Sequence, residues 1–294
     1  MKKSAISLKD VSKKFRDFSI KNLNFDVKRG YVTGFIGPNG AGKTTTIKMI
    51  MGLLKKDSGS IKVFNQIIEE SNVSIKSRIG FVSAESHFYD HLTVDKTRKF
   101  ISGFFNDWDD EIFIKNIKKF NLPLDRKIKH LSTGMKVKLS LCIALSHHAE
   151  LIIMDEPTSG LDPVFRDEIL ELLSEYMIDD NKTIFFSTHI TQDLEQIADY
   201  IVFIYDGKII INESKESLLD KCSIIKGDSN ILNNNTEKFL LGLKKSSFGF
   251  EALSFKKNEM LRKLGDDIHI EKPTLNQIIV YMDRELKKVG NTKF

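Results

Sequence analysis

The segment at residues 37–45, Gly-Pro-Asn-Gly-Ala-Gly-Lys-Thr-Thr, constrains this chain more than any other feature. It fits the pattern G-x-x-x-x-G-K-[ST], whose glycines let the backbone curl until its N–H groups face phosphate oxygens. Lys43 would reach the β- and γ-phosphates, and the Thr44 hydroxyl would ligate Mg²⁺. The apolar run before it predicts a buried strand, and residues 45–54 predict a helix whose positive N-terminus adds to the anion site. The predicted polyphosphate-binding loop consists of Gly37, Pro38, Asn39, Gly40, Ala41, Gly42, Lys43, Thr44 and Thr45.

Two carboxylates follow a second apolar run. Residues 151–154 are Leu-Ile-Ile-Met, typical of a central strand of a parallel sheet, and Asp155 and Glu156 come directly after them. The acids should therefore lie at the carboxyl end of that strand, beside the phosphate loop. We expect Asp155 to hold Mg²⁺ through water and Glu156 to polarise the water that attacks the γ-phosphate. The alternative is that the two acids only begin a surface loop.

A third apolar run ends in a histidine. Residues 183–188 predict another buried strand, and His189 follows it, where it could hydrogen-bond the γ-phosphate and position the attacking water. A surface or capping histidine is the alternative. Residues 132–148 predict a helix with apolar positions at helical spacing, and Ser132 and Gly134 at its start could present a hydroxyl and backbone N–H groups to an anion. An ordinary N-cap serine is the alternative there.

In this order, the segments resemble the motifs of the nucleotide-binding subunit of ABC transporters. Residues 37–45 match the Walker A loop, residues 151–155 match Walker B, and Phe15 stands where the family places an aromatic that stacks on adenine. The family's signature, usually LSGGQ, has the form Leu-Ser-Thr-Gly-Met here. The residues matched to the signature, the D-loop and the switch histidine are Leu131, Ser132, Thr133, Gly134, Met135, Asp162 and His189.

The resemblance extends to a subgroup. Residues 155–163, Asp-Glu-Pro-Thr-Ser-Gly-Leu-Asp-Pro, look like those of bacterial exporter-type subunits. Phe88-Tyr89 before His91-Leu92-Thr93-Val94 looks like ATPases from Gram-positive operons that expel antimicrobial or cytolytic peptides, including the phenol-soluble-modulin exporter.

The resemblance implies a fold and a working assembly. The expected fold is an α/β P-loop NTPase with a RecA-like core, an antiparallel β subdomain, an α-helical lobe and a small C-terminal α+β appendage. The expected cofactors are ATP and Mg²⁺, and the expected partners are an integral-membrane permease and a second nucleotide-binding subunit packed head to tail. Ser132, Thr133, Gly134 and Met135 would then act on the partner chain's ATP. The chain would work in the cytoplasm, peripherally on the inner face of the membrane.

This chain departs from the family pattern in two places. The glutamine that usually follows the strand at 79–82 is missing, and the sequence there runs into Ser83-Ala84-Glu85. Alanine cannot reach Mg²⁺ or water, whereas Glu85 could do so at the cost of added negative charge beside Asp155 and Glu156. We therefore expect altered turnover or coupling. The signature also carries Thr133 and Met135, but Ser132 and Gly134, the expected phosphate contacts, are kept.

Length and composition set the domain organisation. A chain of 294 residues can hold a large α/β domain, expected at 1–212 with its helical lobe at about 86–148, and a small accessory domain at 213–294. No run approaches the roughly 20 apolar residues that span a bilayer, and no apolar signal-peptide core is visible. The net charge of +5 comes from scattered lysines, so we expect no nucleic-acid partner. Cys142 and Cys222 indicate no disulfide framework and suit a reducing cytoplasm.

Three other functions fit the sequence less well than an exporter ATPase. A soluble ABC protein acting on ribosomes or DNA usually carries two cassettes or a long coiled coil, and neither is visible here. A small-molecule P-loop kinase leaves residues 131–135 and His189 unexplained. A catalytically inactive partner subunit is disfavoured because Lys43, Asp155, Glu156 and His189 are all present.

Overall fold

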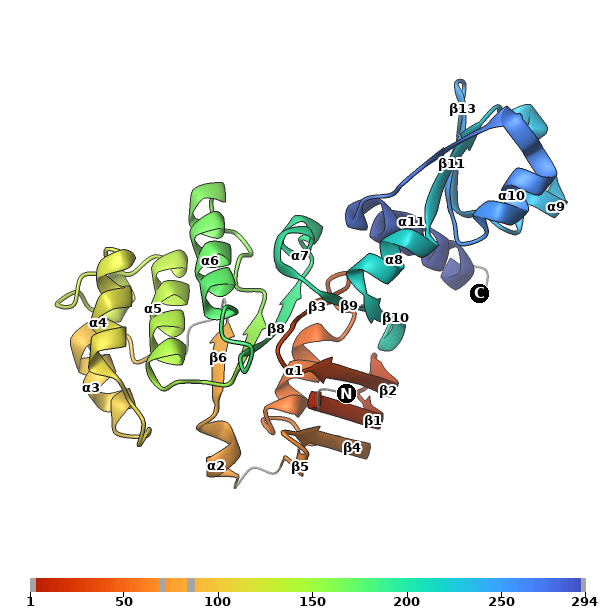
Figure 1. Ribbon diagram of the computed structural model, residues 1–294. Coiled ribbons are helices and arrows are strands. Elements are labelled where there is room, and N and C mark those ends of the chain that lie inside the picture. The colour runs from red at the N-terminus through yellow and green to blue at the C-terminus, as the bar shows by residue number, and fades with distance from the viewer. Residues whose placement is uncertain (1–3, 69–71, 84–87, 292–294) are drawn as a thin grey trace. The chain divides into compact units, whose positions relative to one another are not determined.

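The structure is a computed structural model that describes residues 4–68, 72–83 and 88–291. The chain divides into two compact units, Met1–Asn212 and Glu213–Phe294, which we call the N-terminal and C-terminal units (Figure 1). Ala84 and Glu85, expected at the position of the missing glutamine, lie outside the described residues. No helix in the described ranges combines the length and the apolar content needed to cross a bilayer.

A six-stranded sheet organises the N-terminal unit. Its strand order is β10-β9-β3-β8-β7-β6, and the neighbours from β9 to β6 run parallel. The three central strands are buried along their whole length, as their continuous apolar runs predicted. Parallel order brings the carboxyl ends of β3, β7 and β8 to one edge of the sheet. The strands are β3 (Val32–Ile36), β6 (Ile79–Ser83), β7 (Leu151–Asp155), β8 (Thr183–Thr188), β9 (Tyr200–Tyr205) and β10 (Lys208–Ser214).

A four-stranded antiparallel sheet, ordered β2-β1-β4-β5, shares its core with the parallel sheet. Helix α1 (Lys43–Ile50) contributes Ile47, Met49 and Ile50 to this core, together with Phe35 and Phe185 of the parallel strands. The helix after the phosphate loop is thus fixed by apolar packing. The strands are β1 (Ser4–Lys14), β2 (Ser19–Lys28), β4 (Ser58–Val63) and β5 (Gln66–Ile67), and the short helix α2 (Val73–Lys76) follows them.

The helical lobe is formed by α3 (Val94–Ser102), α4 (Asp110–Lys119), the 3-10 turn η1 (Ile128–His130) and α5 (Thr133–Ser146). Helix α5 packs against α4 and β6, and a Cβ atom on Gly80 would lie 2.6 Å from the Cβ of Ala144. An aromatic side chain in such a lobe is expected in its core, but that of Phe104 is 66% exposed. The polypeptide between α3 and α4 is irregular, which leaves Phe104 outside the packed helical faces. Two further helices, α6 (Pro163–Tyr176) and α7 (Thr191–Ile197), follow β7 and β8.

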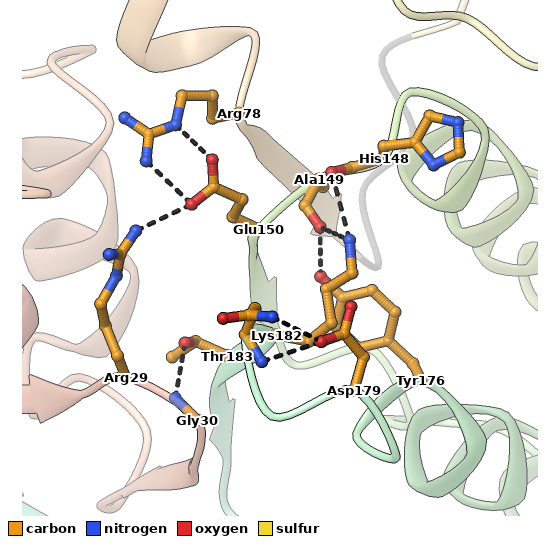
Figure 2. A network of polar contacts seen from close by, with 11 residues as sticks. Arg29, Gly30, Arg78, His148, Ala149, Glu150, Tyr176, Asp179, Lys182 and Thr183 are labelled. Carbon is orange, nitrogen blue, oxygen red and sulfur yellow. Dashed lines mark hydrogen bonds and ion pairs between the residues drawn. The ribbon is translucent and has the colours of Figure 1, made fainter. Parts of the chain in front are cut away.

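A polar network closes the edge of the parallel sheet where the strands begin (Figure 2). Glu150, the residue before β7, accepts hydrogen bonds from Arg78 Nε at 2.6 Å and Arg78 Nη2 at 2.8 Å. It also accepts one from Arg29 Nη2 at 2.8 Å. Both guanidinium groups lie over the ring of Phe64, at 4.0 Å for Arg78 and 4.9 Å for Arg29. The network joins the antiparallel sheet to the parallel sheet at the edge opposite the phosphate loop.

The C-terminal unit is a four-stranded antiparallel sheet ordered β12-β13-β11-β14, with helices packed on it. Its last helix begins at Leu275, and Thr274 caps it by accepting from Gln277 N at 3.1 Å. The side chain of Tyr281 on this helix is buried. The elements are α8 (Lys215–Lys221), β11 (Ser223–Gly227), η2 (Ser229–Ile231), α9 (Asn234–Glu237), β12 (Leu241–Ser246), β13 (Gly249–Ser254), α10 (Lys257–Leu264), η3 (Gly265–Asp267), β14 (Ile268–Glu271) and α11 (Leu275–Asn291).

Candidate functional site

The predicted phosphate loop connects β3 to α1, as the motif requires. Gly40 and Gly42 have φ angles of 79° and 107°, which L side chains rarely adopt. A Cβ atom on Gly37 would lie 2.3 Å from the carbonyl oxygen of Ile204, so this glycine is required by close backbone approach. Of the remaining loop residues, Asn39 and Thr44 are exposed, Pro38 and Thr45 are half-buried, and Ala41 is buried.

Lys43 is folded into the loop. Its side chain is only 5% exposed, and its Nζ donates to the carbonyl oxygens of Gly37 at 2.7 Å and Pro38 at 3.1 Å. The same Nζ lies 3.1 Å from Oε1 of Glu156. This last contact is an ion pair without hydrogen-bond geometry, since Glu156 Oε1 has no hydrogen-bond partner. The lysine is therefore held ready inside the loop by groups that a phosphate anion can replace.

The two acids lie at the carboxyl end of β7, as the sequence predicted. Asp155 is 7% exposed and accepts a hydrogen bond from Ser187 Oγ at 2.7 Å. Glu156 Oε2 lies 2.6 Å from Nδ1 of His189. Lys43, Glu156 and His189 thus form a continuous chain of contacts between the residues that follow β3, β7 and β8. The topology of the parallel sheet brings these three groups together from distant parts of the sequence.

Glu156 has an unusual backbone. Its φ angle is +51°, the left-handed region, which costs a non-glycine residue about 1 kcal/mol or more. Its N–H donates to the carbonyl oxygen of Ser187 at 3.0 Å, and its carbonyl oxygen accepts from Ser159 N at 3.2 Å. These bonds hold the strained residue in place. Strain of this kind is concentrated at functional sites, where it orients a side chain.

The signature residues begin α5. Ser132 is the N-cap and accepts from Met135 N at 3.3 Å, so the capping role that sequence alone left open is present. Ser132 and Thr133 are exposed, Met135 is half-buried, and Gly134 is buried against Phe165. A Cβ atom on Gly134 would lie 2.6 Å from Cε1 of Phe165, which explains a glycine here. Among the described residues, no hydrogen bond or ion pair joins this segment to the phosphate loop of the same chain.

Two other predicted residues lie on the surface. Asp162 is exposed and caps α6 by accepting from Phe165 N at 3.0 Å. Phe15 is 39% exposed, and its ring lies 6.3 Å from that of Phe18. The ring of Phe18 in turn approaches Gly42 of the phosphate loop, because a Cβ atom there would lie 3.0 Å from Phe18 Cζ. Phe15 therefore presents an aromatic surface within reach of the phosphate loop.

Sequence reasoning missed several polar side chains around this site. Ser187 bonds both Asp155 and the backbone of Glu156 from β8, and its only sequence signal is a serine inside an apolar strand. Asp193, on α7, is fully buried and accepts from Thr158 Oγ1 at 2.6 Å and from Arg166 Nε. No spacing in the sequence indicated that Thr158, Arg166 and Asp193 meet.

The oxygen groups of the site suit Mg²⁺. This ion is usually held by one or two carboxylates together with substrate phosphates, hydroxyls and water. Asp155 supplies a carboxylate whose orientation is fixed by Ser187, and Thr44 supplies an exposed hydroxyl at the start of α1. In the part of the chain that the structure describes, no cluster of His, Cys, Asp or Glu could hold a metal alone.

The parallel sheet and the loop between β3 and α1 define a nucleotide-binding α/β protein of the P-loop class. The ABC transporter family model matches residues 20–159. The chain is 37% identical to the bacitracin transport ATP-binding protein BcrA of Bacillus licheniformis, over 65% of this chain and 63% of that protein. It is 35% identical to the lantibiotic transport ATP-binding protein SrtF of Streptococcus pyogenes, over 66% of this chain and 83% of that protein.

A solved structure described as the ATP binding subunit of an ABC transporter superimposes with a TM-score of 0.67 and 25% identity. The superposition covers 74% of this chain and 93% of that one. The chain belongs to the ABC transporter family of ATP-binding proteins. Its match spans less than two thirds of the bacitracin protein's length.

Proposed function

We propose that this protein hydrolyses ATP to drive a separate membrane permease that exports peptide, lipid or drug-like cargo. The observation that carries the proposal is the assembly of Lys43, Glu156 and His189 at the carboxyl edge of the parallel sheet. These groups supply a cation for the phosphates, a general base and a group that orients water. Similarity to a bacitracin transport ATP-binding protein and a lantibiotic transport ATP-binding protein supports export as the purpose.

Binding of nucleotide would rearrange the contacts of Lys43. A triphosphate carries more negative charge than the single carboxylate of Glu156, so the Lys43 ammonium would move from Glu156 and the loop carbonyls to the phosphates. Glu156 would then keep its hydrogen bond with His189 and accept a proton from the attacking water. Mg²⁺, bound through Thr44 and Asp155 with the phosphates, would neutralise charge on the transferred group. Phe15 would stack on the adenine ring.

A second ATP-binding subunit would complete the site. Ser132, Thr133, Gly134 and Met135 would face the partner chain's nucleotide, and Asp162 would lie at the contact between the two subunits. The exposure of Ser132, Thr133 and Asp162 supports this arrangement, because residues that meet a partner must be accessible in the single chain. ATP would hold the dimer closed, since only the closed form contacts it from both sides.

A membrane permease is the second proposed partner. Tyr89, Phe100 and Phe104 are 57%, 48% and 66% exposed. The ring of Phe100, on α3, meets those of Tyr89 before the helix and Phe104 after it edge to face. A contiguous group of exposed aromatic rings is typical of a surface that binds another protein. We propose that this aromatic surface contacts the permease and holds the subunit peripherally on the inner face of the cell membrane.

Two finer assignments belong to the same proposal. Residues 88–94 favour the group of ATPases that export antimicrobial or cytolytic peptides, such as phenol-soluble modulins. Residues 1–212 would form the ATP-binding domain, with residues 213–294 as an accessory domain, in line with the division into two compact units.

Glu156→Gln in the full-length chain tests the proposal. The amide keeps the shape of the side chain and a hydrogen-bond acceptor, but it cannot take a proton at neutral pH. We expect MgATP to bind with an affinity within about threefold of the parent, and hydrolysis to fall by about 100-fold or more, as loss of a general base does. Parental protein that fails to bind or hydrolyse MgATP would overturn the proposal, and a fully active Glu156→Gln variant would remove Glu156 as the base.

A further inference from the structure

Asp193 is a buried carboxylate that the catalytic chain of Lys43, Glu156 and His189 does not use. Its side chain is 0% exposed, and both of its oxygens are engaged. Oδ2 accepts from Thr158 Oγ1 at 2.6 Å, and Oδ1 accepts from Nε of Arg166. Burial raises the pKa of the Asp193 carboxyl, and the bonds from Thr158 and Arg166 oppose that shift. A charged group is kept in a protein interior only with partners of this kind, because removing it from water is costly.

The partners of Asp193 come from the segments that carry the catalytic groups. Thr158 lies two residues after Glu156, and Asp193 lies four residues after His189. The bond from Thr158 to Asp193 is therefore a second link between the same two segments that Glu156 and His189 join at 2.6 Å. Arg166 adds the first turns of α6, whose N-cap is Asp162.

The hydrogen bond between Thr158 and Asp193 can hold Glu156 and His189 in position, which neither residue's own surroundings do fully. Glu156 is in the left-handed backbone region, a conformation that persists only where surrounding structure imposes it. His189 is 41% exposed, so packing alone does not fix the histidine ring. The bond between Thr158 and Asp193 is buried, and both residues follow the catalytic side chains closely in the sequence.

We propose that Asp193 is a positioning residue whose buried contacts with Thr158 and Arg166 hold the Glu156 segment at a set distance from His189. The inference rests on the proposed ATPase function and adds to it. Because Asp193 is fully buried, it would touch neither the nucleotide nor the attacking water. It acts through Thr158 on the direction of the Glu156 carboxylate, and through α7 on the position of His189. Loss of this link would leave nucleotide binding by the 37–45 loop intact and would slow the chemical step.

The test compares steady-state MgATP hydrolysis by full-length variants. Asp193→Asn keeps the volume of the side chain but loses the charge that pairs with Arg166. We expect kcat to fall about 10- to 100-fold, the effect of a small misplacement of catalytic groups, while KM for MgATP stays within about twofold. Glu150→Gln is the matched control, since this carboxylate also pairs with arginines but lies at the opposite edge of the sheet. It should leave kcat at the parental value.

A second pair of variants keeps the proposal testable if Asp193→Asn does not fold. Thr158→Ser retains the hydroxyl that donates to Asp193, whereas Thr158→Val replaces it with a methyl group of similar size. We expect Thr158→Ser to keep near-parental kcat and Thr158→Val to lose about tenfold or more. A purely structural role would lower the unfolding midpoint of both variants without separating their kcat values.

The outcomes separate this inference from the proposed function. Parental kcat in Asp193→Asn, or equal kcat in Thr158→Ser and Thr158→Val, would overturn the positioning role even if Glu156→Gln is inactive. A parent chain without any MgATP hydrolysis would overturn the ATPase function instead. A rise in KM that matches the fall in kcat/KM would also count against the proposal, because it would place Asp193 in nucleotide binding.

Discussion

Replacing Glu150 should destabilise the N-terminal unit measurably without touching the nucleotide site. Three charge-assisted hydrogen bonds end on this carboxylate, two from Arg78 and one from Arg29, at 2.6 to 2.8 Å (Figure 2). Glu150→Ala removes all three and leaves two guanidinium groups stacked over Phe64 without an anion. Glu150→Gln keeps one carbonyl acceptor and loses the charge.

The magnitude follows from the partial exposure of the network. The side chains of Arg29, Glu150 and Arg78 are 34%, 34% and 35% exposed, so water screens the network in part. Breaking a buried ion pair costs about 3–5 kcal/mol, and an exposed pair contributes about 0.2–1 kcal/mol. Between these limits, we expect Glu150→Ala to lower the free energy of unfolding by about 2 kcal/mol and Glu150→Gln by about 1 kcal/mol.

Urea denaturation followed by tryptophan fluorescence measures the loss of unfolding free energy in the N-terminal unit. The chain has a single tryptophan, Trp108, which lies in the N-terminal unit with its ring 5.6 Å from that of Phe113. The signal therefore reports that unit in the full-length protein. With a denaturant slope of about 2–3 kcal/mol/M, the midpoint of Glu150→Ala should fall by roughly 0.7–1 M.

The stabilisation that the Glu150 network contributes should decrease at acidic pH. The hydrogen bonds from Arg78, followed by the charges of Arg78 and Arg29, lower the pKa of Glu150 in the folded protein. The stabilisation is therefore complete above the unfolded pKa of about 4.3 and is lost as pH falls through the lower folded pKa. The gap between parent and Glu150→Ala should be constant from about pH 8 to 5 and should narrow below about pH 4.

Glu175→Ala is the matched control. Glu175 pairs with Lys119 at 2.7 Å, but the two side chains are 59% and 39% exposed, so the expected loss is about 0.5 kcal/mol or less. A parental midpoint for Glu150→Ala at pH 7, or a loss no larger than that of Glu175→Ala, would refute the reasoning from partial burial.

Two further predictions concern the nucleotide loop and the aromatic surface. Gly37→Ala should abolish MgATP binding in a fluorescent-nucleotide titration, because the new Cβ would lie 2.3 Å from the Ile204 carbonyl oxygen. A Cβ at Gly40 would meet open space, so Gly40→Ala should weaken binding about tenfold through backbone strain alone. Equal effects of the two substitutions would argue against steric crowding at Gly37. The double variant Phe100→Ser, Phe104→Ser should reduce co-purification with the proposed permease at least tenfold. The control Phe248→Ser, at a residue 99% exposed in the C-terminal unit, should not reduce it. Retention of the permease by the double variant would exclude the aromatic surface as its contact.

Much of the fold could be predicted because its signals are local. The runs at β3, β7 and β8 are continuously apolar, as strands buried on both faces must be, and the structure confirms all three. The glycine spacing of residues 37–45 requires a tight loop between a strand and a helix, and that context is present. Parallel order then brings the ends of these strands to one edge, so the proximity of Lys43, Glu156 and His189 could be anticipated.

Other features could not be predicted because they depend on contacts between distant residues. Phe104 has a large apolar side chain of the kind found in cores, yet it lies after the end of α3 and remains exposed. A proline such as Pro273 can occupy the first turn of a helix, yet the cap formed by Thr274 places the start of α11 at Leu275. The polar network around Glu150 joins it to Arg78, 72 positions away in the sequence, and to Arg29, 121 positions away.

The sequence by itself determined which chemical groups this protein carries and the order, along the chain, of the strands that present them. Short runs of residues are enough to indicate loop geometry and strand burial. Only the tertiary structure decided how the groups are held. Nothing local in Thr158, Arg166 or Asp193 indicates a partner, and their meeting requires the packing of α6 and α7 after β7 and β8. The left-handed backbone of Glu156 likewise exists only because the neighbouring strand accepts its N–H and the surrounding loops impose the turn.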